Sequence, residues 1–170
     1  MPKLTQVKET KRGRYALFFD GEFAFSLDED TFAMAGLHTG DELEEWQIHD
    51  LQTKSDTRKA VDKAMDLLAL RDHAAGELYQ KLCRSFDPHS AAAAVAKMQE
   101  LNLLDDAGFA RRRAAELLRK RKSRRAILDD LHAKGIDRGA AAEAVEALFA
   151  QSEEDEEENP ELANARALVE

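Results

Sequence analysis

The densest group of like side chains in this sequence is a basic run between residues 111 and 125. Nine of the fifteen residues are arginine or lysine, and Glu116 is the only acid among them. Seven of the nine are arginine, whose planar guanidinium can donate paired hydrogen bonds to a phosphate or a carboxylate. We call this run the basic elbow, and its members are Arg111, Arg112, Arg113, Arg119, Lys120, Arg121, Lys122, Arg124 and Arg125.

The composition of the basic elbow favours binding. A charge run is ordinarily no more than a solvated helix face. A face that served solubility alone would mix signs, because like charges at i and i+4 repel each other. No aromatic residue interleaves the run, so base stacking is not indicated. Arg112 and Arg119 lie opposite the apolar side of their helix on a helical wheel. We therefore expect them to face solvent and to meet a phosphate backbone or an acidic protein groove.

Two pairs of aspartates are the alternative source of chemistry. Asp105-Asp106 precedes a helix, where a carboxylate caps free N–H groups and meets a favourable helix dipole. Asp129-Asp130 lies within the next helix, beside the basic elbow, and is interpreted as a surface counter-charge. Asp105-Asp106 has no nearby histidine or serine to complete an acid–base set, and His132, close to Asp129-Asp130, is interpreted as a cation favoured near a helix end. The sequence therefore indicates a protein that is not an enzyme, with a hydrolase that uses these aspartates kept as an alternative.

The remaining reactive side chains do not predict a metal or cofactor site. No two of the five histidines are spaced at i and i+4, and none belongs to a Cys/His cluster. No glycine-rich loop of the phosphate-cradling kind occurs, so no cofactor is expected. The single cysteine, Cys83, excludes an internal disulfide and is interpreted as a buried, inert thiol of a reducing compartment.

The basic elbow belongs to a longer helical stretch, residues 101–136. An apolar turn and two aspartates come first, then a helix, the elbow and a second helix that stops at Lys134-Gly135. The total charge of −9 hides the local balance: residues 55–150 carry +3, whereas residues 1–54 carry −5 and residues 151–170 carry −7. Since partners respond to local potential, the basic middle is the expected binding part.

The helical part of the sequence repeats. Residues 55–102 and 105–150 each read as a three-helix unit with apolar residues at i, i+3, i+4 and i+7. Asp56 and Asp106 correspond, as do the strings 84–87 and 134–137. We expect helix caps at Ser55-Asp56, Asp72 and Asp87-Pro88. Because one unit cannot bury its own face, the units should stack into a curved, elongated array.

A third unit is expected to begin after residue 150. Residues 151–170 are interpreted as an acidic linker, with six acids in a row from Glu153 to Glu158, followed by the start of an incomplete third repeat. Ala167-Leu168 falls on the position of Leu117-Leu118. Two explanations stay open: the third unit is fragmentary by nature, or the sequence stops inside it.

Residues 1–54 predict a small β-rich extension. Two alternating strands flank Asp20-Gly21, a two-residue hairpin turn, and residues 4–10 can add a third strand. Phe23, Phe25 and Leu27 should share one face. A short helix at 29–35, a second at 44–51 and a polar linker at 52–55 follow. The expected fold is mainly α, with tandem three-helix repeats preceded by this antiparallel extension.

Nothing in the sequence predicts a membrane protein. No apolar run approaches the roughly 18 residues that a membrane span needs. The first fourteen residues are polar and lack the apolar core of a signal peptide. We therefore expect a soluble, cytoplasmic protein.

Four strings together resemble one known family. They are LDDxxFA at residues 104–110, KGI at 134–136, RDHAAGELYQKL at 71–82 and DGEFAFSLDED at 20–30. Their order and spacing, together with the three-helix repeat, resemble the RecX family of bacterial recombinase regulators over nearly the whole chain. Two positions depart from the family pattern: Leu103 stands where an aromatic residue is commoner, and the third repeat is almost absent.

The resemblance implies a non-enzymatic modulator of RecA. Members lie in the helical groove of the RecA–DNA filament and reduce its ATP hydrolysis, strand exchange and co-protease activity. It also implies contact with single- or double-stranded DNA. We expect no membrane association and a monomeric state. The alternative is a DNA-binding helical protein that acts without a filament partner.

Overall fold

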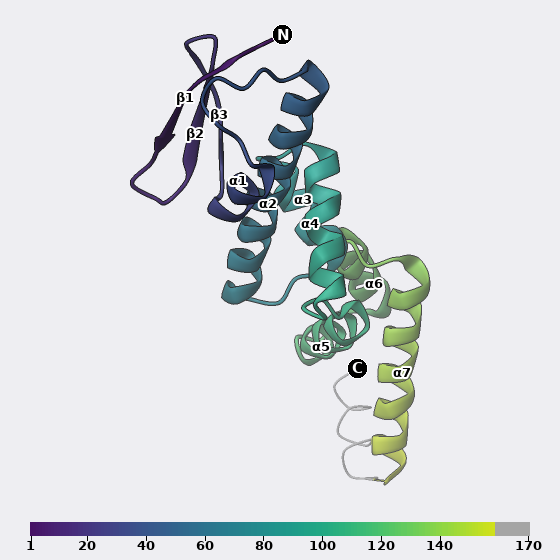
Figure 1. Ribbon diagram of the computed structural model, residues 1–170. Coiled ribbons are helices and arrows are strands. Elements are labelled where there is room, and N and C mark those ends of the chain that lie inside the picture. The colour runs from purple at the N-terminus through teal and green to yellow at the C-terminus, as the bar shows by residue number, and fades with distance from the viewer. Residues whose placement is uncertain (159–170) are drawn as a thin grey trace. The chain divides into compact units, whose positions relative to one another are not determined.

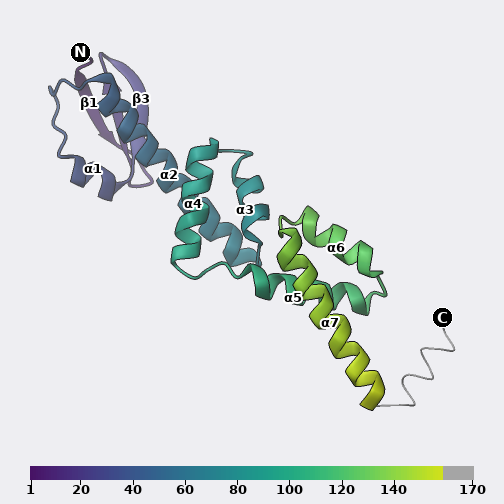
Figure 2. The same ribbon diagram turned by 90° about the vertical axis from the view of Figure 1, so that its right-hand side faces the viewer.

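The computed structural model describes residues 1–158, with side chains as far as Glu154. The fold is mainly helical with a small antiparallel sheet, as the sequence predicts (Figures 1 and 2). Ala167-Leu168, predicted to begin a third repeat, lies outside the described residues. The elements are β1 (Leu4–Glu9), β2 (Tyr15–Phe19), β3 (Glu22–Leu27), α1 (Glu29–Ala35), α2 (Glu45–Leu70), α3 (Ala75–Leu82), α4 (Pro88–Glu100), α5 (Asp106–Arg119), α6 (Arg124–Ala133) and α7 (Arg138–Glu158).

The chain packs as two compact units. The first contains Met1–Asp66 and Lys81–Met98, and the second contains Leu67–Gln80 and the chain from Gln99 onward. None of the helices within residues 1–158 combines the length and the apolar character needed to cross a membrane.

The first unit is built on a three-stranded sheet in the order β1-β2-β3. The β2–β3 hairpin turns at Asp20 and Gly21, whose φ angles of 51° and 84° are those of the predicted turn. Leu17 and Leu27 are fully buried in its core. The prediction that Phe23 shares one face with Phe25 and Leu27 is wrong. A bulge at the centre of the β2–β3 pair adds one residue and turns Phe23 away from the core, so that it is 60% exposed.

Local capping signals fix helix α1 and helix α4. Asp28 accepts a hydrogen bond from the Thr31 amide at 3.1 Å, and Gly36 ends α1 with a φ of 59°. Asp87 accepts from the Ser90 amide at 3.1 Å, as predicted, and Asp137 accepts from the Ala140 amide at 3.3 Å fifty positions later.

Helix α2 contradicts the predicted linker. It runs without a break from Glu45 to Leu70, so the predicted helix end at Leu51, the linker at 52–55 and the cap at Ser55-Asp56 are wrong. Ser55 is 1% exposed; its hydroxyl donates to the Ser26 carbonyl and accepts from the Arg14 guanidinium. Because these long-range bonds satisfy the hydroxyl, a residue that prefers caps lies inside the helix.

The second unit packs α5, α6 and α7 around one core. Phe109, Leu117, Ile127, Leu131 and Ile136 are buried in it. The predicted helices on either side of the basic elbow are confirmed as α5 and α6. The predicted linker over Glu153–Glu158 is wrong, because α7 continues to Glu158. Glutamate is a good helix former, and extending an existing helix carries no nucleation cost.

The first turn of α3 meets the α6–α7 loop backbone to backbone. A Cβ atom on Gly76 would lie 2.7 Å from the carbonyl oxygen of Gly135. A Cβ atom on Gly135 would lie 2.7 Å from the Gly76 Cα, and the φ of Gly135 is +85°. Only two glycines allow the two segments to approach this closely.

We expect Gly76→Ala to destabilise the protein by about 1–3 kcal/mol, because the added methyl group meets fixed backbone atoms. Urea unfolding should show this as a lower midpoint. Gly139→Ala is the matched control, since its nearest neighbour would lie at 3.3 Å on a side chain and it has no positive φ. Equal midpoints for Gly76→Ala and the wild type would contradict the close contact.

Candidate functional site

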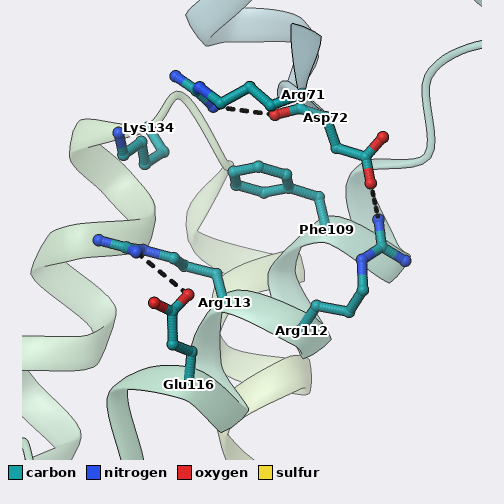
Figure 3. A pocket seen from close by; sticks show the side chains of 7 residues that line it. All are labelled: Arg71, Asp72, Phe109, Arg112, Arg113, Glu116 and Lys134. Atoms are coloured by element: carbon teal, nitrogen blue, oxygen red, sulfur yellow. Dashed lines mark hydrogen bonds and ion pairs between the residues drawn. The ribbon is translucent and has the colours of Figure 1, made fainter. Parts of the chain in front are cut away.

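Two members of the basic elbow line a pocket in the second unit. The pocket has a volume of about 370 Å³, and Arg112 and Arg113 share its wall with Arg71 and Lys134. The ring of Phe109 lies among these side chains (Figure 3). Asp72 and Glu116 complete the lining. We call this set the cationic pocket.

Sequence reasoning found only half of the pocket's cations. Arg112 and Arg113 were expected from the density of the basic elbow. Arg71 precedes α3 and Lys134 follows α6, and neither stands in a basic run. The one sequence feature that could have identified them is that each belongs to a string that carries the family resemblance. The charge pattern could not identify them, because the pocket is assembled from segments far apart in sequence.

Asp130 holds Arg113 in place. Nε and Nη2 of Arg113 donate to the two oxygens of Asp130 at 2.8 and 3.0 Å. These bonds from Arg113 lower the pKa of Asp130 and raise the pKa of Arg113. The prediction that the second aspartate pair supplies a counter-charge is confirmed for Asp130, and a bidentate, half-buried pair fixes the direction of its arginine.

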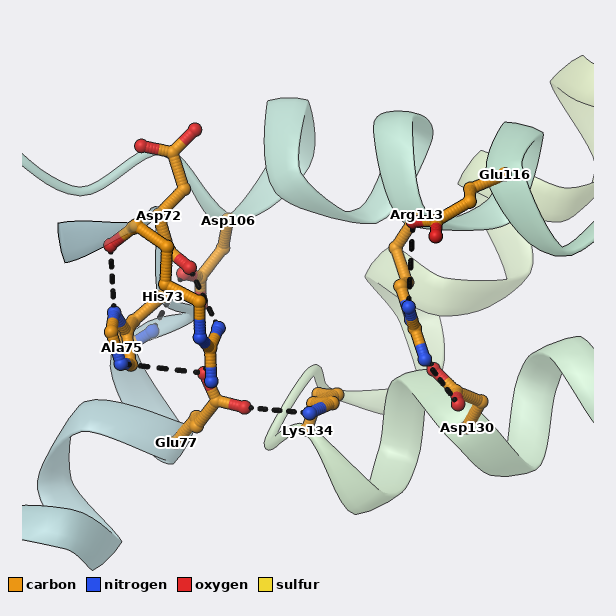
Figure 4. Close-up of polar contacts among 10 residues, drawn as sticks. Asp72, His73, Ala75, Glu77, Asp106, Arg113, Glu116, Asp130 and Lys134 are labelled. Atoms are coloured by element: carbon orange, nitrogen blue, oxygen red, sulfur yellow. Dashed lines mark hydrogen bonds and ion pairs between the residues drawn. The ribbon is translucent and has the colours of Figure 1, made fainter. Parts of the chain in front are cut away.

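Glu77 ties the other two cations together. Its side chain is only 9% exposed, and one of its oxygens lies 2.9 Å from Arg71 Nη1. The other oxygen lies 3.1 Å from Lys134 Nζ (Figure 4). Burial alone would raise the pKa of Glu77, but the hydrogen bonds and charges of Arg71 and Lys134 outweigh it. The pKa therefore lies below its ordinary value. His73 is buried beside this group, with Nδ1 2.9 Å from the Arg71 carbonyl oxygen.

The first aspartate pair caps two different helices. Asp105 accepts from the Gly108 amide at 3.0 Å and so caps α5, as predicted. Asp106 accepts from the Ala75 amide at 2.8 Å and so caps α3 (Figure 4). The prediction that Asp72 caps this helix is wrong: α3 begins three residues later, and the Asp72 carboxylate contacts Arg112 instead.

The rest of the basic elbow is mostly exposed. Lys120 lies 3.3 Å from Glu116, and the guanidinium of Arg124 lies 4.9 Å above the Phe149 ring. Arg112 and Arg119 are exposed, as the helical wheel predicts. Within the part of the chain with described side chains, five members of the elbow contact neither a carboxylate nor an aromatic ring: Arg111, Arg119, Arg121, Lys122 and Arg125. We call these five the unpaired elbow cations.

Metal binding has no support among the described residues. No group of three or more histidine, cysteine, aspartate or glutamate side chains within residues 1–154 is placed to hold a metal ion. The polar chemistry of the second unit is therefore that of the cationic pocket and the unpaired elbow cations, which suit an anionic partner.

In a comparison with known proteins, the three relatives described below carry the same name. No family model matches. The regulatory protein RecX of Lactobacillus gasseri is 31% identical over 158 residues, which are 92% of this chain and 57% of that protein. RecX of Lactobacillus delbrueckii subsp. bulgaricus is 36% identical over 140 residues, 81% of this chain and 52% of that protein. RecX of Caldanaerobacter subterraneus subsp. tengcongensis is 27% identical over 149 residues, 87% of this chain and 76% of that protein.

The solved structures agree on the fold. A crystal structure of regulatory protein RecX has a TM-score of 0.63 and 24% identity, and it covers 87% of this chain and 74% of that one. Fold and surface thus define a helical protein with a basic surface on its second unit. The sequence relatives place the chain in the RecX family of regulatory proteins. The chain spans between about half and three quarters of the length of these curated relatives.

We expect Glu77→Gln to destabilise the protein by about 1–3 kcal/mol at neutral pH, because two cations lose their shared carboxylate. The folded pKa of Glu77 lies below its ordinary value of 4.5, so its stabilisation is present above that pH and is lost as pH falls through the folded pKa. The difference between the two proteins in urea unfolding should therefore shrink on acidification. Glu143→Gln, at an exposed site on α7, is the control; a difference that stays constant to low pH would contradict the ion-pair role.

Proposed function

We propose that this protein regulates the recombinase RecA by binding in the groove of the RecA–DNA filament, where it lowers ATP hydrolysis, strand exchange and co-protease activity. It acts in the cytoplasm as a monomer. The named relatives are regulatory proteins, which supports this assignment. The observation that carries it is the basic surface of the second unit: the unpaired elbow cations lie on α5, on α6 and in the loop between them, and α5 also carries Arg112 and Arg113 of the cationic pocket.

The surface suits a nucleoprotein filament because such a filament offers two kinds of anion. DNA supplies phosphates, which bind flexible, exposed cations. Protein subunits supply carboxylates, which arginine binds through a paired, planar contact. The second unit has exposed cations of both lysine and arginine, so one surface can meet both.

The contacts of the aspartates argue for a regulator without catalytic activity. Asp105 and Asp106 cap helices, and Asp130 is bound to Arg113. The hydrolase hypothesis needs a carboxylate pair with an acid–base partner, and these contacts commit Asp105, Asp106 and Asp130 to structural roles.

Binding to DNA alone is the second candidate function, favoured by the unpaired elbow cations. Phosphate-dominated binding weakens steeply with salt, by about 0.9 log unit in affinity per log unit of salt for each contact. A shallow salt dependence combined with a strict need for RecA would favour the filament. A steep dependence on DNA without RecA would favour the alternative.

Reversing the charge of Arg112 and Arg119 together should abolish inhibition of the RecA ATPase. Both side chains are exposed, so Arg112→Glu/Arg119→Glu should fold with the wild-type circular dichroism spectrum and lose only its attraction for anions. The measurement is the rate of single-stranded-DNA-dependent ATP hydrolysis by RecA as a function of added protein.

Lys8→Glu/Lys63→Glu is the matched control, with the same change of charge at exposed positions of the first unit. It should inhibit as the wild type does. Full inhibition by the arginine variant, or equal loss in both variants, would count against the basic surface as the contact.

A further inference from the structure

Two carboxylates of this chain occupy the cationic pocket from its exposed side. Asp72 lies 3.2 Å from Arg112, and Glu116 lies 3.4 Å from Arg113 (Figure 3). We propose that these two positions receive carboxylate side chains of the protein partner, which displace Asp72 and Glu116 on binding. This inference rests on the proposed function and names the chemistry by which the partner is recognised.

The two exposed pairs are weak enough to exchange. The side chains of Arg112 and Asp72 are 59% and 74% exposed, and Glu116 is 43% exposed. An exposed ion pair contributes about 0–1 kcal/mol, because water and salt screen it. Displacing these carboxylates therefore costs little.

The half-buried Asp130 and the buried Glu77 have the opposite effect. Asp130 accepts two hydrogen bonds from Arg113, and the buried Glu77 forms ion pairs with Arg71 and Lys134. These carboxylates remain in place while the outer ones leave. The cations are thus pre-positioned, so a ligand does not bear the cost of ordering them.

The charge balance favours a carboxylate over a phosphate backbone. The four cations of the pocket are matched by four carboxylates, namely Asp72, Glu116, Glu77 and Asp130. An incoming carboxylate replaces an internal one with no change in charge. A polyanion gains more from the unpaired elbow cations, where each contact releases counterions. The nearly buried Phe109 ring adds an apolar surface for the carbon stem of a glutamate or aspartate.

Removing the internal competitors tests the proposal. Asp72→Asn/Glu116→Gln should tighten binding to RecA–single-stranded-DNA filaments by about two- to tenfold, because Arg112 and Arg113 no longer have to release a partner. The matched control is Glu143→Gln/Glu146→Gln on α7, which adds the same charge outside the pocket and should change affinity less than twofold. Equal gains in the two double variants, or no gain in the first, would overturn the proposal. A gain of the same size with a thymidine oligonucleotide alone would assign the pocket to phosphate and overturn it as well.

A probe independent of RecA separates this inference from the proposed function. Nε–H resonances of Arg112 and Arg113 are followed by NMR while N-acetylglutamate or inorganic phosphate is added to the full chain. N-acetylglutamate should shift both resonances, and at lower concentration in Asp72→Asn/Glu116→Gln than in the wild type. No shift, or a response to phosphate at lower concentration than to the carboxylate, would refute the site even if filaments bind. If filaments do not bind but the carboxylate shifts appear, the proposed function fails and the pocket stands.

Discussion

One buried carboxylate, Glu77, determines how the second unit presents its charges. It sits at the first turn of α3 and is shared by Arg71 before that helix and Lys134 after α6. Burying a carboxylate is unfavourable unless charges and hydrogen bonds compensate, so the two cations must approach it closely. That approach requires Gly76 and Gly135 to touch through their backbones. The cationic pocket is a consequence of this contact, since it draws basic side chains from distant segments toward one carboxylate.

The basic surface contains two physically different kinds of cation. Those of the pocket are oriented by carboxylates of the same chain, and under our proposal a carboxylate of the partner replaces an exposed one. The unpaired elbow cations are exposed, contact no carboxylate among the described side chains and respond to any negative potential, with strong dependence on salt. A regulator that must recognise an assembly of protein and DNA can use both kinds. The chain shares its fold with a solved RecX structure and about a third of the aligned residues with RecX relatives, while it spans only about half of the length of several of them.

Sequence reasoning succeeded where the controlling interactions are local. The turn at Asp20-Gly21, the cap at Asp87 and the helix after Asp28 are set by residues within four positions of one another. It failed where contacts with residues distant in sequence determine the local structure. Ser55 is of a type that often caps helices, but its hydroxyl donates to the Ser26 carbonyl of the sheet. Phe23 fits the alternating strand pattern, but a bulge that the pattern does not reveal turns its side chain to the other face. Only half of the pocket's cations were predicted, for the same reason. Arg112 and Arg113 stand in a basic run that is visible in the sequence, whereas Arg71 and Lys134 reach the pocket through long-range packing.

Hydrogen–deuterium exchange of the full chain, with and without RecA–single-stranded-DNA filaments, tests the central claim most directly. A basic face on the second unit that contacts the filament predicts slower exchange in the segments around Arg71 and from Phe109 to Arg125. Protection confined to the β-sheet of the first unit, or exchange that the filament leaves unchanged throughout, would contradict it.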